Sequence, residues 1–371
     1  MIRLSKSYIS KKEINSVVKV MNKKFLGMGT EVKKFERDLE KIFGRYSLCV
    51  VNGTAAIQIS LQVAGIKKGD EVLVQSFTYV STIQAITALG AKPVFCDINI
   101  DNISIDLEDA EKKISKKTKA ILPVHYAGQT GQLENIYKFA KKYKICVIED
   151  AAHAFGSKYK NRLIGKKGDL VCFSFDGIKN ITSGEGGAII TSNKIYAERI
   201  KAVRLLGVIG DSKNRYKNKR TWDFDVKEQG WRYHMSDIMA SIGRIQLANR
   251  NKMFFKRKKI ATQYIKNLKK NNKIKLILEN VEEIVPHIFP IIIYRLKNKD
   301  KLRKKLLDNK IETGIHYKPN HLLSFFRQKN VKLPKTEFLY KNIITLPIHP
   351  EITIKEVNFI CKTLKNIINT I

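Results

Sequence analysis

The stretch FSFDGIKNITSGEGGA, residues 173–188, decides how the rest of the chain is interpreted. It overlaps the end of an apolar run of strand length at residues 170–175 and leads into a second such run at residues 188–191. Between the two runs, Lys179 stands among isoleucines and glycines rather than among further charges. Because burial lowers the pKa of a lysine and frees its amine for Schiff-base chemistry, we expect Lys179 to be a reactive amine beside a strand end.

Apolar runs of strand length alternate with helical patterns through the first two-thirds of the chain. Besides the two runs above, strands are expected at residues 48–52, 71–74, 93–96, 121–125 and 145–148. Helical spacing separates several of them, at residues 57–64, 80–89 and 133–143. This alternation predicts an α/β core with a largely parallel sheet.

The length of 371 residues exceeds a typical single core, so two structural units are expected. Ser236 opens a long helical pattern, and beyond residue 249 the chain changes to basic helices with two apolar runs at residues 287–294 and 342–348. We therefore predict a large domain of residues 1–248 and a smaller α+β domain of residues 249–371. Residues 1–25 are expected to pack against the small domain or a partner subunit.

The chain is strongly basic, with 70 lysines and arginines against 34 aspartates and glutamates, a net charge of +36. Such a balance can indicate binding to nucleic acid or to a membrane surface. Here lysines recur as pairs along the whole chain rather than in one tail or stripe, so solvated faces are the preferred interpretation and no nucleic-acid partner is expected. A diffuse positive field would still attract a substrate that carries phosphates.

Two further features bear on the compartment. No apolar run approaches the length that spans a bilayer, so no membrane insertion is predicted. The five cysteines lie far apart and form no Cys-x-x-Cys pair, which favours reduced thiols in a cytoplasmic protein.

Three polar features follow predicted strands, where open α/β sheets place ligands. Residues 52–56, NGTAA, combine a strand end, a glycine and a helix start, which suits a phosphate, although a plain strand-to-helix turn has the same pattern. Asp150 ends another strand, either as a helix N-cap or as the partner of a cation. With Lys179 they supply the anchor, the ring-nitrogen partner and the amine that pyridoxal phosphate requires.

The sequence resembles the sugar aminotransferases of the DegT/DnrJ/EryC1/StrS family, within the fold-type-I pyridoxal-phosphate enzymes. The resemblance runs from FLGMG at residues 25–29 to LPIHP at residues 346–350 and is strongest over residues 149–153, 173–188 and 230–247. It implies a large domain with a mostly parallel mixed sheet and a smaller C-terminal α+β domain.

The resemblance also implies roles for the cofactor-binding residues. Lys179 would hold pyridoxal 5'-phosphate covalently, Asp150 would face the pyridine nitrogen, and His153 would lie near the phenolic oxygen. Tyr79 falls where an aromatic ring stacks on the cofactor, although core packing also explains a tyrosine there. The positions that match phosphate contacts are Gly53, Thr54 and Ser174.

One block departs from the family pattern. Relatives often have Gly-Tyr-Asn-Tyr-Arg-Met where this chain has GWRYHM at residues 230–235. In relatives the Asn reaches the cofactor phosphate from the partner subunit, which implies a homodimer with shared active sites. Arg232 replaces that Asn, and contact with the phosphate, contact with the sugar nucleotide, and a surface position all stay open.

The C-terminal histidines are not spaced as a metal set, so no metal site is predicted. His316 and Tyr317 resemble a family segment that lines the substrate mouth, and we predict that they bind substrate. The remaining histidines of this region, His287, His321 and His349, are interpreted as structural.

The predicted function is a pyridoxal-phosphate-dependent aminotransferase that moves an amino group from L-glutamate to a nucleotide-linked keto sugar. The resemblance favours a 4-keto-6-deoxy sugar and the synthesis of amino sugars for surface polysaccharides. A keto-cyclitol or another small ketone is the alternative substrate, and a basic nucleic-acid-binding or surface-binding protein is the alternative of another class. Related dehydratases have His in place of the lysine, so Lys179 argues against that reaction.

Overall fold

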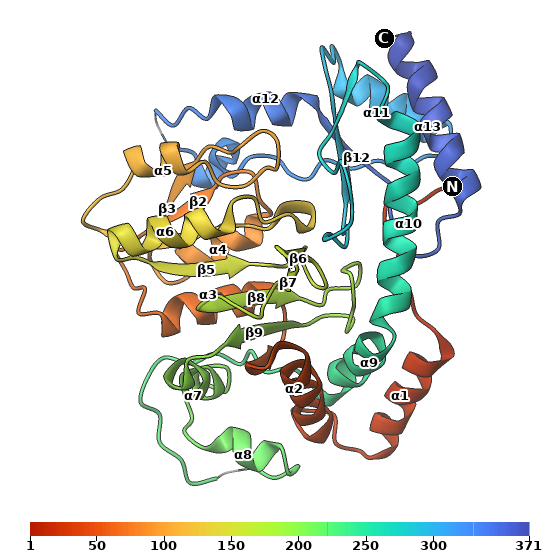
Figure 1. The fold of residues 1–371 in the computed structure, drawn as a ribbon. Coiled ribbons are helices and arrows are strands. Elements are labelled where there is room, and N and C mark those ends of the chain that lie inside the picture. The colour runs from red at the N-terminus through yellow and green to blue at the C-terminus, as the bar shows by residue number, and fades with distance from the viewer. Residues whose placement is uncertain (221, 329, 371) are drawn as a thin grey trace.

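A seven-stranded sheet forms the centre of the computed structural model, which describes residues 1–220, 222–328 and 330–370 (Figure 1). Its strands lie in the order β1-β9-β8-β5-β4-β2-β3. Their bounds are β1 Tyr46–Val50, β2 Glu71–Gln75, β3 Lys92–Cys96, β4 Thr118–Leu122, β5 Cys146–Asp150, β8 Leu170–Ser174 and β9 Gly187–Thr191. Neighbours from β3 to β8 pair in parallel, whereas β9 is antiparallel to both β8 and β1. The predicted α/β class with a mostly parallel mixed sheet is confirmed.

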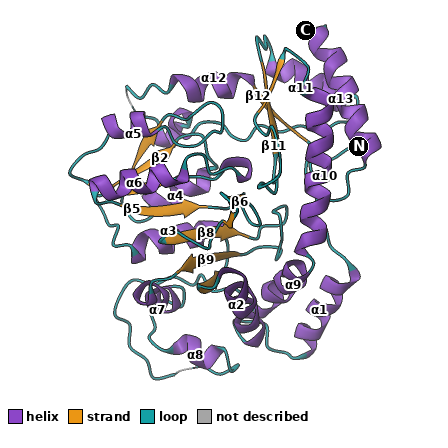
Figure 2. Ribbon diagram, in the orientation of Figure 1, coloured by secondary structure: helices purple, strands orange, loops and turns teal. Residues whose placement is uncertain are grey.

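Helices cover both faces of this sheet, which explains why its strands read as nearly continuous apolar runs (Figure 2). Along β2, Leu73 packs in the cluster with α6, while Val72 and Val74 pack in the cluster with α3 and α4. The alternation of side chains along a strand thus sends successive residues to opposite helix layers. The helices of this part are α1 Lys11–Asn22, α2 Thr30–Phe43, α3 Gly53–Val63, α4 Val80–Thr87, α5 Leu107–Lys112, α6 Leu133–Tyr143, α7 Lys194–Val203, α8 Asp211–Arg215 and α9 Asp237–Ala248.

The C-terminal part builds a second core around the three-stranded antiparallel sheet β10-β11-β12. Its elements are α10 Arg250–Leu268, β10 Ile274–Leu276, β11 Phe289–Ile293, α11 Lys299–Asp308, α12 Pro334–Asn342, β12 Ile343–Leu346 and α13 Ile354–Asn369. A short hairpin, β6 Lys158–Tyr159 with β7 Arg162–Leu163, lies between β5 and β8 in the chain. Short 3-10 turns occur at Tyr126–Gly128, Asn320–Leu322 and Ser324–Phe326.

The N-terminal residues lie against this second core. Ile2 forms a parallel bridge with Ile311, and the Ile348 N–H donates to the Leu4 carbonyl at 3.0 Å. Helix α1 instead packs on α9, whose N-cap Ser236 accepts a hydrogen bond from the Met239 N–H. The long helix α10 runs from the region of α9 to the second sheet (Figure 1). The division into residues 1–248 and 249–371 remains our proposal.

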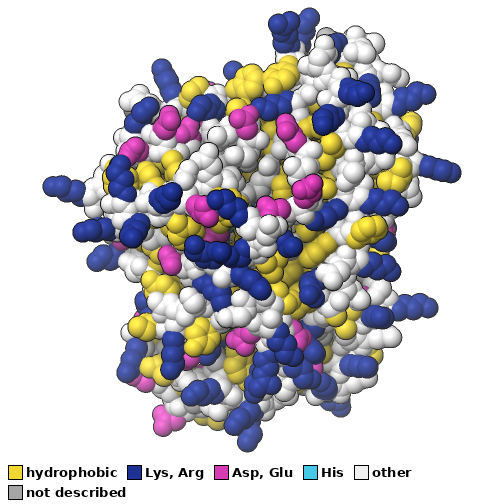
Figure 3. Space-filling view, in the orientation of Figure 1, with side chains coloured by type: hydrophobic (Ala, Val, Ile, Leu, Met, Phe, Trp, Pro, Cys, Tyr) yellow, Lys and Arg dark blue, Asp and Glu magenta, His cyan; other side chains and the backbone are white. Residues whose placement is uncertain are grey.

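Positive side chains are spread over the visible face rather than gathered in one stripe (Figure 3). No helix within the described ranges is long and apolar enough to cross a membrane. All five cysteines are free thiols, and only Cys146 is partly exposed.

Candidate active site

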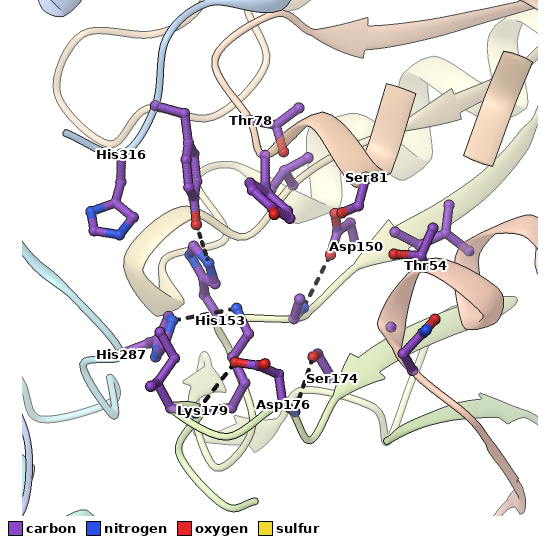
Figure 4. A pocket seen from close by; sticks show the side chains of 18 of the residues that line it. Thr54, Thr78, Ser81, Asp150, His153, Ser174, Asp176, Lys179, His287 and His316 are labelled. Carbon is purple, nitrogen blue, oxygen red and sulfur yellow. Dashed lines mark hydrogen bonds between the residues drawn. The ribbon is translucent and has the colours of Figure 1, made fainter. Parts of the chain in front are cut away.

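A pocket of about 500 Å³ opens at the C-terminal ends of β1, β5 and β8, the edge to which parallel strands direct their polar ends (Figure 4). All of the predicted site residues except Arg232 line it: Gly53, Thr54, Tyr79, Asp150, His153, Ser174, Lys179, His316 and Tyr317. Asn52, part of the predicted phosphate segment 52–56, also lines it. Sequence reasoning assigned no role in the site to the other lining residues, which are Ile57, Thr78, Ser81, Val124, Ala152, Asp176, Ile178, Glu185 and His287.

The start of α3 forms one wall of the pocket. Asn52 caps the helix by accepting a hydrogen bond from the Ala55 N–H at 2.8 Å. The N–H groups that precede Ala55 at the start of the helix have no intrahelical partner and remain available to a ligand. A Cβ at Gly53 would lie 2.9 Å from the Cβ of Ser174, so only glycine fits this close approach of α3 to the end of β8. Free N–H groups and the hydroxyls of Thr54 and Ser174 therefore make a cradle for an anion.

Asp150 ends β5 and is buried at the pocket floor. Thr82 on α4 donates to Asp150 Oδ2 at 2.8 Å, and the Ala152 N–H donates to Oδ1 at 3.1 Å. Burial raises the pKa of Asp150 in spite of these two hydrogen bonds. No ion pair involves this carboxylate in the described part of the chain. A buried carboxylate with fixed donors but no direct ion-pair partner suits a cationic group of a ligand.

Lys179 lies half-buried in the turn after β8, where its N–H donates to the Asp176 carbonyl at 3.1 Å. Its Nζ is 3.3 Å from His287 Nε2 (Figure 4). Burial lowers the pKa of Lys179 to about 8, although Asp176 and Asp150 act in the opposite direction. A lysine with this pKa is partly uncharged near neutral pH and can act as a nucleophile or a base.

Histidine and tyrosine rings enclose the amine on its other side. The rings of His153 and His287 have centroids 4.4 Å apart, and Tyr317 Oη lies 3.0 Å from His153 Nε2. Burial lowers the pKa of both histidines well below the ordinary value and that of His316 to about 4. These three imidazoles are therefore neutral near pH 7 and do not compete with Lys179 for a proton.

Tyr79 stands at the mouth of the pocket, immediately before α4, and 56% of it is exposed. Its ring centroid is 5.4 Å from that of Tyr317, so the two rings flank the entrance. Core packing, the alternative explanation for Tyr79, does not fit this exposure.

Arg232 does not line the pocket of its own chain. It is exposed and forms an antiparallel bridge with Leu205. A role for Arg232 in this chain's own pocket is thus excluded by its position, while a role in a partner's pocket stays a prediction.

Two residues that touch the central groups were missed from the sequence. Thr82 lies three residues after Tyr79 on α4, and this helical spacing beside a predicted site residue was an available signal. His287 lies 108 residues beyond Lys179 in the sequence, and only the packing of the second core against the turn brings the two together. The structural role predicted for His287 leaves out this contact with the lysine amine.

A model of the DegT/DnrJ/EryC1/StrS aminotransferase family matches residues 7–365. The chain belongs to this family. Among curated relatives, the uncharacterized protein MJ1066 of Methanocaldococcus jannaschii is 37% identical over 372 residues, which cover 97% of this chain and 96% of that protein.

Solved structures of this aminotransferase family share the whole fold. Helicobacter pylori PseC, an aminotransferase involved in the biosynthesis of pseudoaminic acid, is 26% identical with a TM-score of 0.93, and all of both chains is covered. Spr1654 of Streptococcus pneumoniae, described as a sugar aminotransferase in its PLP-form, is 28% identical with a TM-score of 0.92, and 100% of this chain and 99% of that chain are covered. The predicted fold type I, the enzyme class and pyridoxal phosphate as the cofactor of the family are confirmed.

Thr82→Val is expected to lower aminotransferase kcat/KM about tenfold, because a hydrogen bond to a charged group is lost without a change in shape. The Thr82 hydrogen bond lowers the pKa of Asp150, so its removal raises that pKa. We expect the ionised Asp150 carboxylate to be the active form, so the acidic limb of the pH–rate profile should move to higher pH. Thr87→Val is the matched control, because Thr87 lies on the same helix and donates only within it. An unchanged profile for Thr82→Val would contradict the assigned contact.

Proposed function

We propose that the chain transfers the amino group of L-glutamate to a keto carbon of a nucleotide-linked sugar, with a preference for a 4-keto-6-deoxy sugar. In the balanced exchange, glutamate becomes 2-oxoglutarate and the keto sugar becomes an amino sugar. The observation that carries the proposal is the convergence in one pocket of an amine with a lowered pKa, a buried carboxylate without an ion pair, and a free helix N-terminus. We place the reaction in the cytoplasm, where free thiols persist.

The pocket fits pyridoxal phosphate at each of its ends. Gly53 and Thr54 at the start of α3, together with Ser174, would hold the phosphate, and Asp150 would meet the protonated ring nitrogen. When bound, the cofactor draws away the electron pair left on a substrate carbon after proton removal. Tyr79 and His153 also line the pocket, where Tyr79 would stack on the cofactor ring and His153 would lie near its phenolic oxygen.

Lys179 would hold the cofactor through its Nζ and, once released, carry a proton to and from the substrate carbon. Its pKa of about 8 makes both protonation states accessible near neutral pH, which general acid–base catalysis requires. Thr82 and the Ala152 N–H would keep the Asp150 carboxylate directed at the ring nitrogen. A charge on Asp150 in this desolvated site would favour the protonated ring.

The sugar nucleotide would enter between Tyr79 and Tyr317, whose rings flank the pocket mouth near His316. The similarity to PseC and Spr1654 supports a sugar as the amino acceptor. The net charge of +36 would attract the phosphates of a nucleotide sugar over a distance. We therefore assign His316 and Tyr317 to substrate binding.

We further propose a homodimer in which Arg232 enters the pocket of the partner chain. Arg232 lies in a segment with several exposed apolar side chains: Leu206, Ile209, Trp222, Phe224 and Val226. Such a cluster is typical of a surface that a partner covers. A two-fold axis would repeat the contact at both pockets, and each Arg232 would add positive charge beside a phosphate.

Lys179→Ala is expected to abolish turnover and the visible absorbance of the bound cofactor, because no other lysine is among the described residues that line the pocket. Borohydride reduction fixes the cofactor to the lysine that holds it, and peptide mapping then identifies that residue. Lys194→Ala, an exposed lysine at the beginning of α7, should keep both the label and the activity. A label on any lysine other than Lys179 would overturn the assignment.

A panel of UDP-, dTDP- and GDP-linked keto sugars, with glutamate as the donor, tests the proposed substrate class. Formation of 2-oxoglutarate should depend on the keto sugar and should be fastest with a 4-keto-6-deoxy sugar. Lys179→Ala protein serves as the inactive control. Turnover of a keto-cyclitol but of no nucleotide sugar would refute the proposal while leaving the aminotransferase class intact.

Shared sites predict recovery of activity in mixed dimers. Lys179→Ala chains and Arg232→Ala chains, each impaired alone, should form one complete site per heterodimer after subunit exchange, because the intact lysine and the intact arginine come from different chains. Lys179→Ala mixed with Asp150→Asn is the matched control, since both losses fall on the pocket that each chain builds itself and no complete site can form. Equal activity of the two mixtures, or full activity of Arg232→Ala alone, would contradict the shared site.

A further inference from the structure

Two arginines lie fully buried within the described residues, and their surroundings differ. Arg204 is 0% exposed and forms an ion pair with Glu36, with a further hydrogen bond to Tyr216 at 2.7 Å. Arg257 on α10 is 2% exposed and takes part in no ion pair in that part of the chain. Accordingly, burial lowers the pKa of Arg257 to about 10, whereas the carboxylate of Glu36 contributes to a raised pKa at Arg204. Arg257 is thus a buried cation without a counter-charge.

The guanidinium of Arg257 donates to backbone carbonyl oxygens of two segments that are far apart in the chain. One nitrogen, Nη2, reaches the carbonyls of Ile178 at 3.1 Å and Lys179 at 3.5 Å, in the turn after β8. The other, Nη1, reaches the His287 carbonyl at 3.1 Å, directly before β11. Further acceptors of Nη1 are the carbonyls of Pro286 at 3.3 Å and Ile348 at 3.5 Å.

Both ends of the amine–imidazole contact are therefore attached to the same guanidinium. The Lys179 Nζ lies 3.3 Å from His287 Nε2, and the main chain of each residue accepts a hydrogen bond from Arg257. The Nδ1 atom of His287 is buried without a hydrogen-bond partner among the described residues, so no second hydrogen bond orients the ring. Its placement beside the amine therefore relies on ring packing against His153 and on the His287 main chain, to which Arg257 donates.

An unpaired buried charge destabilises a fold unless its hydrogen bonds are well satisfied. Arg257 is such a charge, and it lies next to the main chain of Lys179, to whose carbonyl it donates. We propose that Arg257 is a positioning residue, whose guanidinium holds the main chains of Lys179 and His287 together across the two cores and places a fixed positive charge beside the lysine. This inference rests on the proposed function, in which Lys179 is the amine that holds the cofactor.

The charged and titratable groups around Lys179 determine in which direction the loss of Arg257 shifts the pKa of the lysine. They are Asp150 at the end of β5, Asp176 in the same turn, Arg257 on α10, and the neutral rings of His153, His287 and His316. Burial is the main cause of the lowered pKa of Lys179, the two carboxylates oppose it, and Arg257 adds to it. Removing the Arg257 charge therefore raises that pKa, and at a given pH a smaller fraction of the amine is neutral.

The test uses the full chain after removal of the cofactor. Cyanate reacts with neutral amines, so its rate of reaction at Lys179, followed by peptide mass spectrometry against pH, gives the pKa of that residue. Wild-type protein should show a midpoint near 8, and Arg257→Met should move it toward the ordinary lysine value of 10.5. Arg257→Lys keeps the charge but loses the fork of donors, so its midpoint should stay near 8 while attachment of pyridoxal phosphate slows about tenfold.

Arg204→Met is the matched control, because it also removes a fully buried guanidinium but Arg204 is not among the charges that act on Lys179. Its midpoint should stay near 8 even though the protein melts at a lower temperature. An unshifted midpoint in folded Arg257→Met, or an equal shift in Arg204→Met, would overturn the proposal. If Arg257→Met does not fold, Arg257→Lys decides, and an unchanged rate of cofactor attachment would refute the positioning role. A cofactor label on another lysine would refute the assignment of Lys179 in the proposed function. The cyanate titration measures the pKa of Lys179 whichever lysine holds the cofactor, so the two failures can be told apart.

Discussion

Desolvation of the Lys179 amine is the physical constraint on which the rest of the site depends. Burial favours the neutral amine, while Asp150 and Asp176 favour the ammonium, and the balance gives a pKa of about 8. A lysine in open solvent would stay protonated near neutral pH, and one buried without carboxylates nearby would lose its proton far more readily. Proton transfer near neutral pH depends on this balance, so the groups that set it have to be fixed in space.

The sheet supplies most of that fixation. Parallel β5 and β8 end at the same edge and bring Asp150 and Ser174 to one pocket. Antiparallel β9 then returns through the glycine-rich turn and begins at Gly187, where a Cβ would lie 2.5 Å from the Asn52 carbonyl oxygen. The missing side chain lets β9 pack against the start of α3. One glycine therefore helps to place both the helix N-terminus and the turn that carries Lys179.

The second core closes the pocket from the opposite side. It contributes His287 next to the amine, Tyr317 against His153, and the carbonyls that Arg257 holds. Lys179 thus lies between a sheet edge that presents carboxylates and a C-terminal wall of neutral rings. Burial lowers the pKa of His287 and His316 in this wall, so neither imidazole competes with Lys179 for a proton near pH 7.

Local patterns in the sequence predicted the seven strands of the central sheet, helices α3, α4, α6 and α9, and the positions of Lys179 and Asp150 after strands, but not helices α1, α2, α5, α7 and α8. A strand end, a glycine turn and a helix cap are each encoded within a few consecutive residues. Resemblance to a family added the cofactor and the enzyme class. The contacts of Thr82, His287 and Arg257, and the exclusion of Arg232 from its own pocket, were decided only by the tertiary structure. Each of these contacts and positions depends on which distant segments of the chain pack together, and the local sequence pattern does not specify that packing.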